Sequence, residues 1–184
     1  MTNTPGARVP STGTGCGGER PHVKTLTDAA AKSVSLSPKT TSVAALRALR
    51  APQRLGGRIP GVETTTYRIQ ARLVAMRLEG DGDVYLTVVD PKTHETMVVE
   101  FPAVACIREA SAQVRQLMRN ARAALIAACG EPDPGSFTRV GGPATITGVG
   151  FFEPSEGGSD AAPNGIELHP VLGFRMTECS LGAG

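Results

Sequence analysis

The chain has 184 residues, of which 40% are hydrophobic and 20% charged, so it can bury one core of ordinary size with flanking segments. No stretch approaches the roughly 18 uninterrupted apolar residues of a membrane helix, so we expect no membrane partner. Residues 1–10 contain neither the basic start nor the apolar run of an export signal. The sequence therefore predicts a cytoplasmic location.

The formal net charge of +2 conceals two halves of opposite sign. Residues 1–72 carry eleven Lys and Arg against three Asp and Glu, which gives +8, and residues 73–184 carry eight against fourteen, which gives −6. A basic arm on an acidic body either meets an external polyanion or lies back across the body and neutralises it. The count does not choose between these arrangements.

The N-terminal third is predicted to be a tail followed by a basic arm. Residues 1–20 are mostly Gly, Pro, Ser and Thr, which predicts a disordered tail. Residues 21–60 form a short helical arm and linker, in which Ser42 can cap the helix SVAALRALR. We expect Leu46 and Leu49 to dock on the body and Arg47 to remain in water.

From Thr64 the hydrophobic period changes to two. The segments TTTYRIQARLVAMRLE, DVYLTVVD and TMVVEFP are three predicted strands, and the first changes its apolar face midway, which indicates strong coiling. Residues 109–129 follow as an amphipathic helix, and GPATITGVGFFE and NGIELHPVLGF as two further strands. Gly148 and Gly150 fit sharp strand bends.

This order predicts a mainly β (α+β) protein. The five strands would form an antiparallel OB-like barrel with one helix between the third and fourth strands, preceded by the short helical arm. The barrel domain would span 61–176 and a C-terminal tail 177–184. An open α+β sandwich uses the same elements and is the alternative.

Four cysteines, Cys16, Cys106, Cys129 and Cys179, have no CxxC spacing and no neighbouring His, which argues against a zinc knuckle or a redox pair. They are free thiols or form up to two disulfides. Without an export signal, we expect reduced thiols.

The stretches RLVAMRLEGDGDVYLTVVDP, GVGFFE and APNGIELHPVL, with a CGGERPHVKTLTD lead, resemble a group of small, functionally uncharacterised bacterial proteins. The resemblance covers most of positions 16–175. Members often carry export signals, which implies secretion as the alternative location. They also often carry a His-Gly-Gln loop where this chain reads PSEGGSD. The resemblance implies one folding unit and no particular reaction.

Two groups of residues are candidates for metal or acid-base chemistry. Glu167 and His169 alternate in a strand, so they share a face and could act as a catalytic pair or a partial metal site. Asp81 and Asp83 in the turn EGDGD, with Asp90 one strand later, could hold a divalent cation. A nuclease arrangement would gather Asp83, Asp90, Glu100, Glu167 and His169 around such an ion. The structural alternative is a solvated turn and a hydrogen-bonded histidine.

Single-stranded nucleic acid is the other candidate ligand, because OB barrels bind it with aromatic rings and basic side chains. The candidate residues are Arg68, Arg72, Arg77, Tyr67, Tyr85 and Phe152. The alternative is that these few aromatic rings belong to the core.

Three functions follow in order of preference. The first is a non-enzymatic OB-like binding module for single-stranded nucleic acid or a protein partner. The second is a metal-dependent, nuclease-like hydrolase that uses Glu167 and His169. The third is a structural or assembly protein, in which Leu46, Leu49 and the arm contact another subunit. No cofactor is predicted, a divalent metal is compatible with the acidic residues, and the sequence does not determine the oligomeric state.

Overall fold

The computed structural model describes residues 15, 16, 18–153 and 160–182; most of the predicted tail lies outside them. The helices are α1 (Pro21–Lys24), α2 (Val43–Arg47) and α3 (Ala112–Cys129), with a 3-10 turn, η1 (Ala31–Ser33). The strands are β1 (Ser35–Thr40), β2 (Thr65–Leu78), β3 (Val84–Val89), β4 (Thr96–Phe101), β5 (Thr138–Gly141), β6 (Pro143–Phe152), β7 (Ile166–Met176) and β8 (Ser180–Leu181).

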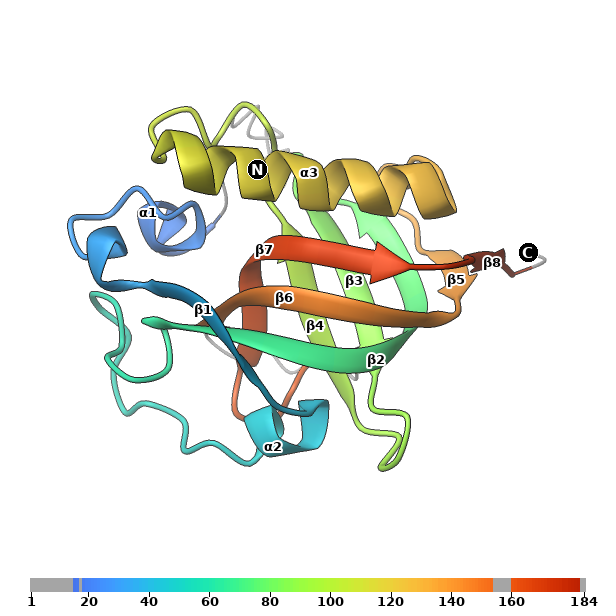
Figure 1. Ribbon diagram of the computed structural model, residues 1–184, viewed down its shortest axis with the longest axis horizontal. Coiled ribbons are helices and arrows are strands. Elements are labelled where there is room, and N and C mark those ends of the chain that lie inside the picture. The colour runs from blue at the N-terminus through green and yellow to red at the C-terminus, as the bar shows by residue number, and fades with distance from the viewer. Residues whose placement is uncertain (1–14, 17, 154–159, 183–184) are drawn as a thin grey trace, which may run out of the picture.

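The five predicted strands correspond to β2, β3, β4, β6 and β7, and they close into a barrel (Figure 1). The pairing runs β2–β3–β4–β7–β6 and returns to β2. The α3 helix lies between β4 and the last two barrel strands in sequence. A mainly β fold with a closed five-stranded barrel and one central helix is therefore confirmed.

The prediction that all strands are antiparallel is wrong. β4 and β7 pair in parallel, with Val98 opposite Glu167 and Val99 opposite Leu168. A parallel pair requires a long connection, and here α3 and β6 lie between the two strands in sequence. β1 also joins β2 in parallel.

β2 changes its buried face, as its sequence pattern predicted. Ile69 and Leu73 point into the core, whereas Arg68 and Arg72 are exposed on the outer face. The register against β3 then shifts between Leu73 and Ala75, after which Met76 is the fully buried residue. This β-bulge inverts the alternation and bends the strand around the barrel.

β6 also shifts register at the two predicted bends. The irregularities lie between Thr147 and Gly148 and between Gly148 and Gly150. A Cβ atom at Gly148 would lie 2.9 Å from Leu168 Cβ, and one at Gly150 would lie 2.8 Å from the ring of Tyr67. Both positions therefore need glycine because other elements approach the backbone closely.

Two helices cover the barrel core on different sides (Figure 1). α3 contributes Ala121 and Leu125 to the core, and α2 contributes Val43 and Leu46. Ser42 caps α2 as predicted, because its Oγ accepts a hydrogen bond from Ala45 N–H at 3.1 Å. None of the helices in the described part of the chain has both the length and the hydropathy of a membrane span.

The arm contains a strand that sequence analysis missed. β1 runs through SLSPKT, which contains Pro38, and among the described strands it pairs only with β2, along one edge. An edge strand tolerates proline because its outer N–H groups need no partner.

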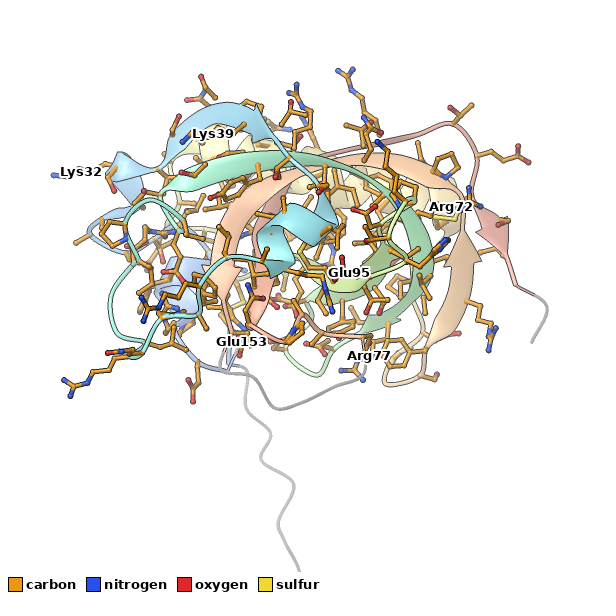
Figure 2. All side chains as sticks on the ribbon, turned by 90° about the horizontal axis from the view of Figure 1, so that it is seen from below. Lys32, Lys39, Arg72, Arg77, Glu95 and Glu153 are labelled. Atoms are coloured by element: carbon orange, nitrogen blue, oxygen red, sulfur yellow. A yellow bond between two sulfur atoms is a disulfide. The ribbon has the colours of Figure 1, made fainter. Side chains whose placement is uncertain are left out.

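The basic arm lies back across the body, which is the second of the two arrangements that the charge count allowed. Lys24 Nζ lies 2.8 Å from Glu153 Oε2 of the acidic half. Arg20 forms a buried ion pair with Glu63, which belongs to the basic half itself. Arg47 pairs with Glu95 at 3.5 Å and donates to the Thr96 carbonyl, so the expectation that Arg47 remains in water is wrong. Figure 2 shows Glu95 beside α2.

All four cysteines are paired, so the expectation of reduced thiols is wrong. The disulfides join Cys16 to Cys106 and Cys129 to Cys179. The first fixes the segment before α1 to the loop after β4, and the second fixes the end of α3 to the segment before β8. Neither pairing has a sequence signature, because the partners are 90 and 50 residues apart.

Candidate metal centre on the outer barrel face

Two neighbouring barrel strands present acidic and imidazole side chains on the outside of the barrel. Val99 in β4 and Leu168 in β7 are paired in register and both belong to the core. Side chains alternate along a strand, so Glu100 in β4 and the pair Glu167 and His169 in β7 point outward. The predicted proximity of Glu167 and His169 is confirmed, since His169 Nδ1 lies 3.2 Å from Glu167 Oε1.

Although these side chains point outward, other segments cover them. His169 is 0% exposed, and Glu167 and Glu100 are 4% and 6% exposed. The ring of Phe151 lies 5.8 Å from the His169 ring, and Lys24 of α1 lies over Phe151 with its Nζ 5.3 Å from the ring centre. The arm thus encloses a polar cluster that a bare barrel would leave in water.

The turn before β3 adds a third carboxylate to the cluster. Asp83 is 4% exposed, and its Oδ1 accepts a hydrogen bond from Ala103 N–H at 2.6 Å. Its other oxygen, Oδ2, lies 3.4 Å from His169 Nε2. Glu100 Oε2 lies 3.0 Å from His169 Nδ1. We call Asp83, Glu100, Glu167 and His169 the acidic-histidine cluster.

The charges in this cluster strongly perturb one another. Burial, together with the charge of Glu100, raises the pKa of Glu167 to about 7. Burial disfavours the imidazolium, but Glu100 and the contacts with Asp83 and Glu167 hold the pKa of His169 well above its ordinary value. Burial also acts against the Asp83 carboxylate, yet His169 keeps the pKa of Asp83 below its usual range.

Lys24 supplies the second cation. Burial acts against its ammonium, but the charges of Glu167 and Glu100 hold the pKa of Lys24 above its ordinary value. Three carboxylates therefore face two cations, His169 and Lys24, within a nearly dry space. A buried surplus of carboxylates is costly unless protons or cations neutralise it.

The cluster has the composition and spacing of a metal site. Asp83, Glu100 and His169 each offer one ligand atom, and these atoms lie within 4.8 Å of one another. Among the described residues, His169 Nε2 has no hydrogen-bond partner although it is fully buried. One imidazole nitrogen with carboxylate oxygens is a donor set that suits Zn²⁺, Mn²⁺ or Fe²⁺ better than Ca²⁺. The residues thus fit a divalent ion.

The structure separates the other two predicted metal ligands from this cluster. Asp90 follows the far end of β3 and accepts hydrogen bonds from the backbone N–H groups of Lys92 at 2.9 Å and Ala44 at 3.3 Å. Seven residues of extended chain place it roughly 20 Å from Asp83, too far to share an ion. Asp81 instead accepts a hydrogen bond from Asp83 N–H at 3.0 Å and so shapes the turn.

A small hollow lies at the protein surface beside the turn that carries Asp83. It has a volume of about 290 Å³ and is lined by the turn residues Glu79, Gly80 and Asp81 together with Arg77. Burial, followed by the charges of Asp83 and Glu100, raises the pKa of Asp81, which places the hollow within electrostatic reach of the cluster.

The predicted nucleic-acid residues do not form one surface. Arg68 and Arg72 are exposed on the outer face of β2, whereas Arg77 lies near its other end with its Cζ 4.8 Å from the Tyr85 ring (Figure 2 labels Arg72 and Arg77). Tyr85 donates to Asp160 at 3.1 Å. We therefore find no shared surface for Arg68, Arg72 and Arg77 along the described β2.

The assignment of Phe152 to nucleic-acid stacking is wrong. Phe152 is 1% exposed and packs in the barrel core, since its neighbour Phe151 takes the outer side of β6. Tyr67 is half-buried, with its hydroxyl 3.4 Å from the Gly61 carbonyl. The Phe152 ring, enclosed in the core, cannot stack on a base.

Comparisons of the chain with protein-family models, curated proteins and solved structures found no match.

Sequence reasoning missed Lys24, which comes from the arm about 140 residues before His169. Its helix has four residues and its Pro-His-Val-Lys sequence carries no motif. The only signal was the opposite charge of the two halves, which is compatible with basic residues of the arm neutralising acids of the body.

Proposed function

We propose that this chain is an OB-type barrel domain that binds one divalent transition-metal ion through Asp83, Glu100 and His169, and that it is a metal-dependent hydrolase. The observation that carries the proposal is the fully buried Nε2 of His169, which makes no hydrogen bond among the described residues and faces Asp83 Oδ2 at 3.4 Å. A metal ion there would take the place of the imidazole proton. Strand order supports the OB type, because the ring β2–β3–β4–β7–β6 with a helix after its third strand is the arrangement expected of that fold.

The position of the cluster also supports a ligand site. OB folds bind ligands on the outer face of their second and third strands and on the adjoining loops. Here those strands are β3 and β4, and the cluster takes Asp83 from the loop before β3 and Glu100 from β4. An acidic face would repel a nucleic-acid phosphate directly, but it attracts a cation.

The side chains have roles suited to hydrolysis. A bound divalent ion supplies Lewis-acid polarisation of the substrate oxygen. Glu167 has a pKa of about 7, which is the value that best suits a general base near neutral pH. Lys24, close enough to Glu167 and Glu100 for their charges to raise its pKa, is placed to offset negative charge on a phosphate ester.

The paired cysteines bear on the compartment in which this would occur. Disulfides persist mainly in oxidising compartments. We therefore propose the secreted alternative, implied by the resemblance, over the cytoplasmic location predicted from residues 1–10.

The packing of Leu46 and Leu49 argues against the assembly function. Leu46 is 1% exposed and packs on the barrel of its own chain, and Leu49 packs against the same core. These side chains are thus not free to contact another subunit as the hypothesis required.

Thermal unfolding with and without metal tests the proposal. Protein stripped with EDTA is melted with Mn²⁺, Zn²⁺, Mg²⁺ or Ca²⁺, and we expect Mn²⁺ or Zn²⁺ to raise Tm. At one hundred times the Kd, binding contributes about 2.7 kcal/mol, which corresponds to roughly 5–10 °C for a chain of this size. Calorimetric titration should give one ion per chain.

Two variants and one control complete the experiment. Glu100→Gln keeps the side-chain shape and His169→Ala removes the imidazole, and both should abolish the rise in Tm. His94→Asn is the control, because His94 is exposed in the turn between β3 and β4. An unchanged melt of the wild-type protein in all four ions would refute the metal site, and metal binding without hydrolysis of a bis(p-nitrophenyl) phosphate substrate would refute only the reaction.

A further inference from the structure

A second concave surface lies on the outer face of β2, β6 and β7, between β1 and α3. Figure 1 looks on to this face, with α3 along one side and β7, β6 and β2 following in order below it. The groove has a volume of about 480 Å³, within the range of ligand pockets. It is separate from the acidic-histidine cluster, with which it shares no residue.

The groove is basic although the body of the protein is acidic. Its lining includes the two guanidinium groups of Arg68 and Arg175 and, among the described residues, no Asp or Glu. Both arginines are exposed, and within the described ranges neither has a carboxylate oxygen within 4.0 Å. Their charge is thus available to an external anion, unlike that of Arg20 or Arg47.

Strand register places hydrogen-bonding groups between the two arginines. Arg68 is opposite Thr147, and Arg175 is opposite Thr145, so the two guanidinium groups flank β6 diagonally. The Thr147 hydroxyl on the groove wall accepts a hydrogen bond from Arg68 Nε at 3.4 Å and keeps its own proton for a ligand. The Thr145 hydroxyl beside it donates to Gln70 Oε1 at 3.1 Å. Arg72 continues the same exposed row of β2, about 13 Å further along the strand.

The chemistry of the lining selects phosphate over bases. Phe174 is the sole aromatic ring of the described lining residues, and it is 6% exposed because it packs in the core. Base stacking requires an exposed ring, whereas arginine and hydroxyl groups are the usual partners of phosphate oxygens.

We propose that this groove binds the phosphates of single-stranded nucleic acid independently of base sequence. Two arginines without an ion pair among the described residues, the row that continues to Arg72 and the Thr147 hydroxyl fit an extended polyanion better than one small anion. The binding needs no metal, so it does not depend on the hydrolase function. It gives the expected nucleic-acid ligand a different surface from the one predicted, retaining Arg68 and Arg72 and adding Arg175.

Salt-dependent binding of a fluorescein-labelled oligothymidylate tests this site. Anisotropy is measured on the full disulfide-bonded chain in EDTA, between about 50 and 200 mM salt. We expect the affinity to fall linearly on a log-log plot. Each phosphate contact on a single strand contributes a slope of about 0.7, so Arg68→Ala with Arg175→Ala should reduce the slope by about 1.4.

Matched variants separate the groove from general charge. Arg139→Ala removes one exposed arginine on β5, outside the groove, and should leave the slope nearly unchanged. Arg68→Lys with Arg175→Lys should retain most of the binding because a phosphate contact needs the charge. Circular dichroism confirms that each variant is folded.

Three results would overturn the proposal: no binding by the wild-type chain at the lowest salt, the wild-type slope in the double alanine variant, or an equal loss in Arg139→Ala. Because the assay contains EDTA, these results are independent of the metal titration. Failure of the metal site would leave the groove proposal standing, and failure of the groove would leave the metal site standing.

Discussion

Replacing Glu167 by Gln should make the metal-free protein more stable at alkaline pH and not at acidic pH. Glu167 is 4% exposed and faces Glu100 of β4, His169 of its own strand and Lys24 of α1. Its pKa rises from an ordinary 4.5 to about 7 on folding, chiefly through burial. Glutamine resembles the protonated carboxyl group and removes this titration.

The sign follows from proton binding in the two states. Below pH 4.5 the carboxyl group is protonated in both the folded and the unfolded chain, so its titration does not lower the free energy of unfolding. Between pH 4.5 and about 7 the unfolded chain loses the proton first, and the free energy of unfolding falls as pH rises. Above pH 7 Glu167 is ionised in the folded protein as well, and the free energy of unfolding is lowered by the full cost of burying this charge.

The size of the effect follows from the same shift. A difference of about 2.5 pH units, which is 7 minus 4.5, corresponds to about 3 kcal/mol. Ionised Glu167 also supports protonated His169, so the measured gain should fall below this limit. At each pH, the free energy of unfolding of wild type is subtracted from that of Glu167→Gln. The predicted gain is this difference at pH 8 minus the same difference at pH 4.5.

Urea unfolding of EDTA-treated protein at a series of pH values measures this quantity. Glu109→Gln, an exposed site before α3, should show a flat difference across the series. A flat difference for Glu167→Gln, or greater stabilisation at pH 4.5 than at pH 8, would refute the reasoning about burial and repulsion in the cluster.

Three further changes have defined outcomes in urea unfolding. Arg20→Ala should lower the free energy of unfolding by about 3 kcal/mol, because it leaves the fully buried Glu63 without its cation. The control Arg54→Ala removes an exposed arginine and should lower it by less than about 0.5 kcal/mol. Equal losses in the two variants would contradict the ion pair between Arg20 and Glu63. Leu46→Ala should cost about 2–5 kcal/mol, since Leu46 is 1% exposed in the core, and a smaller loss would show that α2 docks loosely. Reduction of the disulfides should lower the urea midpoint of unfolding. For the 50-residue loop closed by Cys129 and Cys179, the loss in unfolding free energy has an upper limit of about 4 kcal/mol. An unchanged midpoint, with both bonds verified as reduced, would contradict this prediction.

The barrel was predictable because its strands carry their pattern locally. Alternation in β2 and the change of face near Leu73 depend on neighbouring residues, and both appear in the structure. The parallel pairing of β4 with β7 depends on how α3 and β6 route the chain, which no local window records. β1 was hidden by Pro38, because an edge strand breaks the rule that applies to central strands.

The candidate site was predictable only in part, for the same reason. Glu167 and His169 share a strand, so alternation was enough to place them together. Asp83 and Asp90 looked equivalent in sequence, but six residues of β3 separate them to opposite ends of the strand. Adjacent strand residues such as Phe151 and Phe152 face opposite sides, and only the structure shows that Phe152 faces the core.

The bond between Cys16 and Cys106 has a consequence for how the protein responds to its surroundings. It anchors the chain just before α1, so the ammonium of Lys24 has a high effective concentration beside the carboxylates, set by tether length rather than by dissolved salt. The barrel thus carries its counter-ion as an attached part. In a fragment shortened to the barrel, cations from the buffer would have to neutralise these carboxylates, so the stability of the fragment should depend more strongly on ionic strength than that of the whole chain.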